Sequence, residues 1–240
     1  MNIQTQFINA CKNGNLEEAQ QILQNNPNID ISANDEWAFC FACEEGHLEV
    51  AQWLLEVKPD INISADDEYA FRWACFKKHL EVAKWLLEKK PNIDISTNND
   101  WIFRWTCVYG HLEIAQWLLK VQPNINISSC NESAFRWACE EGYLEVSQWL
   151  LQLKPTIDIS VDNDYAFKMA CENNHILIIK WLYTLNLFKY GIKVNNNETL
   201  FCYIIPDCNE KLLFILYSLT NKGYKNNLTP NLLTNISKYL

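Results

Sequence analysis

Apolar and polar residues follow one another in a pattern that returns every 32 residues along most of the chain. Within one period, Phe71, Ala74 and Cys75 have the i, i+3, i+4 spacing of a short amphipathic helix. A second apolar stripe follows a polar break and consists of Leu80, Ala83, Leu86 and Leu87. Pro91 ends this stripe, and an Asn-, Asp- and Ser-rich stretch leads into the next period. Each period is therefore predicted to form a helix, a tight turn, a second helix and an extended loop.

Three residue types keep the same register through this pattern. The phenylalanine row is Phe7, Phe39, Phe71, Phe103, Phe135 and Phe167. The cysteine row is Cys11, Cys43, Cys75, Cys107, Cys139 and Cys171. The tryptophan row is Trp53, Trp85, Trp117, Trp149 and Trp181. A strict period of this length predicts a stack of repeats, in which each repeat buries its apolar face against its neighbours.

The two ends of the chain depart from the regular period, as expected of terminal repeats that present a polar face to water. We expect a degenerate N-terminal capping repeat over residues 1–33 and five regular repeats over residues 34–193. A degenerate C-terminal repeat is predicted over residues 194–222, and a terminal capping helix over residues 223–240.

The entry to the second helix carries a family resemblance. Residues 46–55 read GHLEVAQWLL and resemble the ankyrin-repeat stretch G-H-L-E-[IV]-V-x-x-L-L. The Asn- and Trp-rich form of the repeats resembles the divergent ankyrin proteins of giant DNA viruses of amoebae. The resemblance implies an all-α, ankyrin-like solenoid of about seven helix–turn–helix units with degenerate caps. One departure is that residues 69–72, with the sequence YAFR, stand where the family has T-P-L-H.

Charge and cysteine usage narrow the classes of partner and compartment. Residues 1–179 carry 13 basic and 26 acidic side chains, so we expect no nucleic acid partner and instead a protein with a basic surface. No signal peptide and no apolar run of membrane-spanning length is recognisable. The periodic cysteines are interpreted as buried free thiols, which indicates an intracellular protein, in the host cytoplasm if the chain is viral. We expect a monomer.

The residues that could support catalysis or metal binding have simpler interpretations. All four histidines, His47, His79, His111 and His175, occupy the same repeat position, so they are predicted to be turn residues that lie too far apart to share a zinc ion. The Cys40–Cys43 pair has redox-motif spacing, but Cys43 belongs to the cysteine row. We therefore predict no enzymatic activity, no metal and no cofactor.

The candidate binding residues follow from the resemblance, which implies a concave groove lined by loop tips and first helices. The aromatic and apolar candidates are Trp37, Tyr69, Phe76, Trp101, Val108, Tyr109 and Tyr165. The acidic candidates are Glu44, Glu45, Glu140 and Glu141. A central aromatic patch with an acidic rim is typical of a protein interface, although Phe76 and Tyr109 could instead only cover neighbouring side chains. The row Arg72, Arg104 and Arg136 is predicted to form intramolecular ion pairs.

The last thirteen residues suggest an alternative function. Residues 228–240 resemble the first helix of an F-box, L-P-x-E-L-L-x-x-I-x-x-Y-L, with the proline displaced by one position and no glutamate. The resemblance implies a substrate adaptor that recruits a ubiquitin ligase through this helix. An amphipathic capping helix is the competing interpretation. The favoured function is non-catalytic protein–protein interaction through the concave face.

Overall fold

The computed structural model describes residues 2–185, 192–194 and 198–200 of the 240-residue chain. The chain forms two compact units, Met1–Ser129 and Cys130–Leu240. Twelve helices and one short hairpin make up the described residues, so the predicted all-α repeat architecture is confirmed. No helix among these residues has the length and apolar character needed to cross a membrane.

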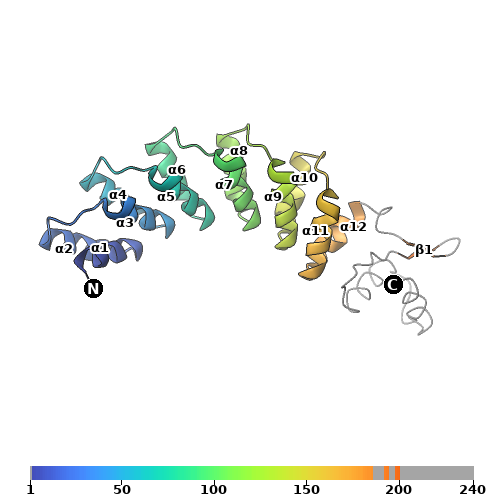
Figure 1. Ribbon diagram of the computed structural model, residues 1–240, viewed down its shortest axis with the longest axis horizontal. Helices are drawn as coiled ribbons and strands as arrows, with labels where there is room; N and C mark the ends of the chain where they lie inside the picture. Colours follow the sequence, from blue (N-terminus) through green and yellow to red (C-terminus); the bar gives the residue numbers. More distant parts are fainter. Residues whose placement is uncertain (1, 186–191, 195–197, 201–240) are drawn as a thin grey trace. The chain divides into compact units, whose positions relative to one another are not determined.

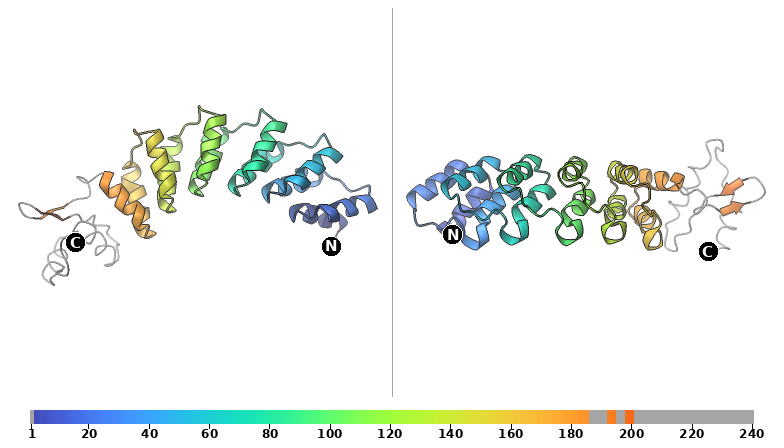
Figure 2. Two further views of the ribbon diagram at one scale, coloured as in Figure 1. Left: turned by 180° about the vertical axis from the view of Figure 1, so that it is seen from behind. Right: turned by 90° about the horizontal axis from the view of Figure 1, so that it is seen from above.

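Unit 1 contains four helix pairs. Their helices are α1 (Ile3–Lys12), α2 (Leu16–Asn25), α3 (Ala33–Glu44), α4 (Leu48–Val57), α5 (Ala65–Phe76), α6 (Leu80–Lys89), α7 (Thr97–Val108) and α8 (Leu112–Val121). The first helices of the pairs, α1, α3, α5 and α7, lie side by side in one row (Figure 1). Figure 2 shows this row from behind and from above, with each second helix paired to its own first helix.

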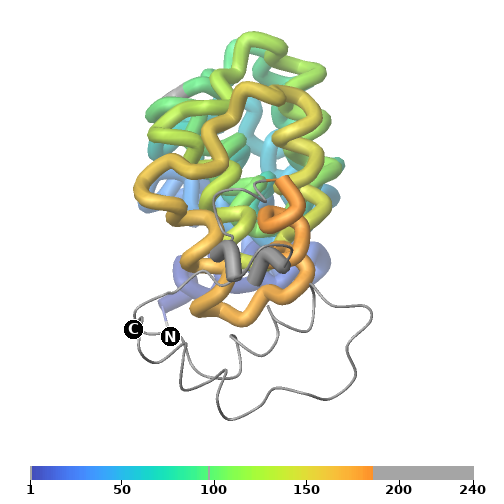
Figure 3. The backbone as a smooth tube through the Cα atoms, turned by 90° about the vertical axis from the view of Figure 1, so that its right-hand side faces the viewer, coloured from blue at the N-terminus to red at the C-terminus, as the bar shows by residue number. Residues whose placement is uncertain are grey.

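Unit 2 contains two further helix pairs and the hairpin. Its elements are α9 (Ser129–Glu140), α10 (Leu144–Leu153), α11 (Val161–Glu172), α12 (Ile176–Leu185), β1 (Ile192–Val194) and β2 (Glu198–Leu200). Figure 3 looks at this unit with α11 and α12 side by side at the front. The strands are antiparallel, and Ile192 pairs with Leu200. The hairpin includes the start of the segment 194–222 that is predicted to be a degenerate repeat. The rest of that segment and the predicted helix 223–240 lie outside the described residues.

The core is built from the three periodic rows. Every phenylalanine of the row is at most 1% exposed. The tryptophan of one repeat packs on the phenylalanine of the repeat before it, as in Phe39–Trp85, whose ring centroids are 6.2 Å apart. Such edge and tilted contacts between large rings contribute about 0.5–1.5 kcal/mol beyond their buried area. The tryptophans therefore fill the space between repeats.

The row cysteines are buried, as the sequence indicates. Among the eight described cysteines only Cys130 is exposed. Burial raises the pKa of Cys11 and of Cys139 to about 12, which keeps these thiols protonated at neutral pH. They act as small apolar residues in the core.

Each linker between repeats is shaped by a local hydrogen bond. An Asp or Asn side chain accepts the backbone N–H of the serine two residues later, at 2.9–3.2 Å, in all five described linkers. This is an Asx turn, which bends the chain with a side chain in place of a backbone acceptor. The Asn62-Ile63-Ser64 sequence is such a turn.

The linkers do not end in protruding loops, which corrects the expectation for this part of the repeat. The first helices α3, α5, α7, α9 and α11 each begin with three consecutive residues in the left-handed region, with φ of 51–67°. Ordinary α-helix follows this left-handed turn at once. Trp37, Tyr69, Trp101 and Tyr165, expected at loop tips, therefore lie in the first regular turn of α3, α5, α7 and α11.

Candidate functional site

Eight aromatic side chains form a continuous ladder along α3, α5 and α7, which we call the aromatic face. They are Trp37, Phe41, Tyr69, Trp73, Phe76, Trp101, Trp105 and Tyr109. Successive rings along this ladder have centroids 4.6–6.4 Å apart. Within each helix the rings are four residues apart or close to it, a spacing that places side chains on one side of a helix. Between helices, contacts such as Phe41–Tyr69 join the rows.

The rings of the aromatic face differ in exposure. Trp37 is 48% exposed and Tyr109 is 46% exposed, so each presents about half of its surface to solvent. Phe76 is only 8% exposed and contacts the rings of Trp73, Trp101, Trp105 and Tyr109. Phe76 therefore supports the other rings and offers little surface of its own.

Three members of the aromatic face are absent from the sequence-based candidates. Phe41, Trp73 and Trp105 lie four residues after Trp37, Tyr69 and Trp101. All three are partly exposed. The i, i+4 spacing of aromatic residues was a usable signal for them. The predicted candidate Val108 lies at the end of α7 and is partly exposed.

The acidic candidates of unit 1 are engaged within the chain. Lys77 Nζ lies 3.0 Å from Glu44 Oε1 and 2.9 Å from Glu45 Oε1. The Tyr69 hydroxyl donates to Glu44 Oε2 at 2.7 Å, and Glu44 is only 8% exposed. The hydrogen bond from Lys77 lowers the pKa of Glu45, and the same bond raises the pKa of Lys77. Both carboxylates of the expected acidic rim next to Tyr69 are thus paired with Lys77, which offsets part of their charge.

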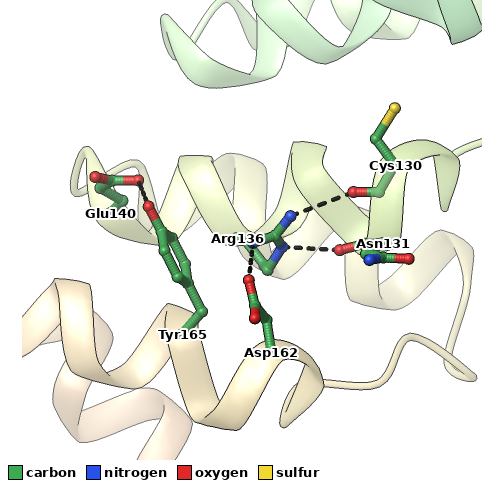
Figure 4. Close-up of polar contacts among 6 residues, drawn as sticks. All are labelled: Cys130, Asn131, Arg136, Glu140, Asp162 and Tyr165. Carbon is green, nitrogen blue, oxygen red and sulfur yellow. Dashed lines mark hydrogen bonds and ion pairs between the residues drawn. The ribbon is translucent and has the colours of Figure 1, made fainter.

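Two of the three candidates of unit 2, Glu140 and Tyr165, belong to a cluster of polar contacts drawn in Figure 4. The Tyr165 hydroxyl donates to Glu140 Oε2 at 2.8 Å, which repeats the Tyr69–Glu44 bond. Burial, followed by this carboxylate, raises the pKa of Tyr165 to about 12. The Arg136 guanidinium lies 4.9 Å from the centre of the Tyr165 ring. Glu141 is exposed.

The arginine row stabilises the left-handed turns. Arg104 Nε donates to the Asn99 carbonyl at 2.9 Å, and a terminal nitrogen of Arg104 donates to the Asn98 carbonyl at 3.1 Å. Arg136 makes both equivalent bonds, to the Asn131 and Cys130 carbonyls, and Arg72 makes one, from a terminal nitrogen to the Asp66 carbonyl. The predicted ion pair is present for Arg136, whose nitrogen lies 2.9 Å from Asp162 Oδ2 (Figure 4). The bonds to backbone carbonyls were not predicted.

The histidines pack against the preceding repeat. A Cβ atom built on Gly46 would lie 2.4 Å from the His79 ring, and Gly14 and Gly142 face His47 and His175 in the same way. His111 Nε2 lies 2.6 Å from the Phe76 carbonyl oxygen. Burial lowers the pKa of His79 and of His111. Within the described part of the chain, no group of three or more His, Cys, Asp or Glu side chains could hold a metal ion.

Comparison with protein-family models agrees with this architecture. The model for ankyrin repeats (three copies) matches residues 7–99, 73–163 and 103–198. A comparison with curated proteins finds no significant match. The family matches extend over most of the chain, from within α1 to beyond α12. The chain therefore belongs to the ankyrin-repeat family.

Proposed function

We propose that the protein is a non-catalytic binding module whose protein partner docks on the aromatic face. Ankyrin repeats generally mediate protein–protein interactions, and no enzymatic family is indicated. The observation that supports this surface is the ladder of ring contacts with Trp37 and Tyr109 about half exposed. Aromatic side chains of this kind are enriched at the energetically dominant positions of protein interfaces.

The packing of the rings suits them to binding. Phe76 and Trp105 contact the half-exposed Tyr109 ring, and Phe41 contacts the half-exposed Trp37 ring. An already ordered side chain loses little conformational entropy when a partner covers it, and this saves about 0.5–1.5 kcal/mol per residue. The face is therefore organised before a partner arrives.

The first partners to test are proteins of an amoebal host. This choice rests on the resemblance of the Asn- and Trp-rich repeats to those of giant DNA viruses. The partner would then be a host or viral protein within the infected cell. The ubiquitin-ligase adaptor remains the alternative function, and its segment 228–240 lies outside the described residues.

Affinity capture from amoebal lysate with quantitative mass spectrometry tests the proposal. The baits are the full chain, a Trp37→Ala, Tyr109→Ala variant, and a matched Val57→Ala, Val121→Ala variant. Val57 and Val121 are 45% and 40% exposed but end the second helices α4 and α8. We expect partner recovery to fall by tenfold or more only in the first variant, because truncating a dominant interface residue costs about 2 kcal/mol or more.

Two other outcomes would change the assignment. Equal recovery by all three baits would show that the partner binds elsewhere. A fourth bait that lacks residues 223–240 tests the adaptor, since loss of a ligase subunit from this bait alone would support that function. Circular dichroism of every bait checks that the helices are retained.

A further inference from the structure

We propose that the aromatic face binds an extended, arginine-bearing segment of the partner protein. This inference rests on the proposed function and adds the chemistry of what is bound. The arginine side chains would stack on exposed rings and pair with carboxylates at the N-terminal edge of the first helices. The supporting observations are cations already placed on rings of this face, unpaired carboxylates in the turns just before Trp37 and Tyr69, and the charge of unit 1.

Rings of this surface already hold cations within the chain. Lys12 Nζ lies 4.8 Å from the centre of the Phe41 ring, and the Arg72 guanidinium lies 5.2 Å from that of Trp101. These are distances at which the negative face of an aromatic ring attracts a cation. Among the described residues, no lysine or arginine lies over Trp37 or Tyr109. The two most exposed rings are therefore open to a cation from outside.

Unit 2 repeats the same arrangement with all its parts in place. There Arg136 lies over the Tyr165 ring and also pairs with Asp162, a residue of the left-handed turn that precedes Tyr165 (Figure 4). One guanidinium thus contacts both a ring and a carboxylate of the same first helix. The combination suits arginine, whose planar group stacks and donates hydrogen bonds at once.

Three carboxylates of the left-handed turns in unit 1 have no such partner, and one of them, Asp66, occupies the repeat position of Asp162. Asp35, Asp66 and Asp67 are exposed, and they lie in the left-handed turns just before Trp37 and Tyr69. No ion pair of these three side chains occurs within the described residues. Glu44 and Glu45, by contrast, are occupied by Lys77. The free acidic edge is therefore the one at the N-terminal ends of α3 and α5.

The overall charge of unit 1 favours the same ligand. Residues 1–129 carry 10 basic and 18 acidic side chains, which attracts a cationic segment and repels phosphate. If a purely apolar helix docked here, the carboxylates at this edge would be left buried or unpaired. Their desolvation would cost free energy. A basic segment can both stack on the rings and pair with the carboxylates.

Titration calorimetry with synthetic peptides tests the inference on the full chain. The probe is a twelve-residue (Arg-Gly-Ser)4 peptide, and its controls replace every arginine with lysine or with citrulline, the uncharged isostere. We expect the citrulline peptide to bind at least tenfold more weakly and the lysine peptide to fall between the two. Trp37→Ala should weaken arginine-peptide binding about 3- to 5-fold, which corresponds to one exposed cation–π contact.

A matched pair of charge variants distinguishes binding at this acidic edge from non-specific electrostatic attraction to the protein. Asp35→Asn, Asp66→Asn, Asp67→Asn removes the edge, and Glu49→Gln, Glu88→Gln, Glu113→Gln removes three exposed acids from the second helices. We expect about fivefold weaker binding for the first variant, as for three exposed ion pairs, and less than a twofold change for the second.

Three results would overturn the inference. Equal weakening by the two triple variants would mean non-specific attraction, and equal binding of the citrulline peptide would mean that charge is irrelevant. If no arginine peptide binds while lysate capture still depends on Trp37 and Tyr109, the cation chemistry is wrong and the proposed protein-binding function stands.

Discussion

Glycine and histidine recur at the same positions of most repeats because each contacts an equivalent residue in a neighbouring repeat. Gly46 has φ of +83°, and the His79 ring fills the space where its side chain would be. The Gly-His pair at the turn was recognisable from the sequence. Its physical reason was not, because the contact joins a glycine to the histidine of the following repeat and not to its own neighbour.

A double-mutant cycle tests this contact. Gly46→Ala should destabilise the protein by more than the roughly 1–2 kcal/mol of a left-handed non-glycine residue, since the new methyl group also meets the His79 ring. In a His79→Ala background only the backbone cost should remain. Urea unfolding measures both free energies, and equal costs in the two backgrounds would rule out the steric contact.

Lys78 provides a natural control for the backbone cost. It occupies the position equivalent to Gly46 in the next repeat, with φ of 67°. Lys78→Gly should therefore stabilise the protein by about 0.5–1 kcal/mol, because glycine adopts this conformation without strain while it also gains entropy in the unfolded chain.

At the scale of elements, the helices were predictable and their beginnings were not. Apolar spacing located Phe71 to Cys75 on one helix, as observed. The residues before them, Asp66 to Glu68, looked like an extended loop but form the left-handed turn. Asp and Asn tolerate this conformation singly, so local preference does not predict three in succession.

The left-handed turns are stabilised by contacts with residues outside the turns themselves. Arg104 binds two carbonyls of its turn from five and six residues away. The last residue of a turn also accepts a backbone N–H from the next linker, as Glu36 does from Asn62 at 3.1 Å and Asp100 from Asn126 at 3.3 Å. A partner 26 residues away is invisible to local sequence patterns.

Removal of Arg104 should therefore destabilise the left-handed turn of α7. Arg104→Met is expected to cost about 1.5–3 kcal/mol, the range for hydrogen bonds from a charged group, because two carbonyls lose their donor. Lys84→Met serves as the control, since Lys84 makes an exposed pair with Glu81 and should cost less than about 0.5 kcal/mol. Thermal unfolding followed by circular dichroism compares them. Similar costs for the two variants would show that the arginine does not support the turn.

At the scale of the whole molecule, the sequence predicted the repeat frame more completely than the binding surface. The strict spacing identified the buried rows because equivalent side chains are buried in the same way in every repeat. The surface was predicted only in part, because exposure depends on which neighbour covers a ring. Phe76 looked like an exposed anchor and is buried, whereas Trp37 and Tyr109 remain open.

The buried histidines make the stability of the array depend on pH. Burial lowers the pKa of His79 and His111 below the ordinary value of 6.5, so the unfolded chain binds protons more readily than the folded one. Stability should therefore decline as pH falls through 6.5, and the decline from these groups should end below their folded pKa. Glu45, whose pKa is lowered, adds a separate loss below about 4.5.

Chemical unfolding between pH 3 and 8 measures this dependence. A His79→Gln, His111→Gln variant should show a shallower decline between pH 7 and 5 than the unchanged protein. The loss below pH 4.5 should persist, because the Glu45–Lys77 pair is intact in that variant. An unchanged slope between pH 7 and 5 would exclude these histidines as its origin.

The contacts between repeats recur at constant offsets along the chain, and this has an evolutionary consequence. Glu36 reaches Asn62 as Asp100 reaches Asn126, and Phe39 meets Trp85 as Phe71 meets Trp117. Recombination that deletes or duplicates one 32-residue stretch would therefore rejoin partners of the same kind. Loss of residues 65–96 would preserve these bonds but remove Phe76 and Tyr69 from the surface. Unequal crossing-over could thus replace the binding specificity of such a gene in one step while its fold is inherited intact.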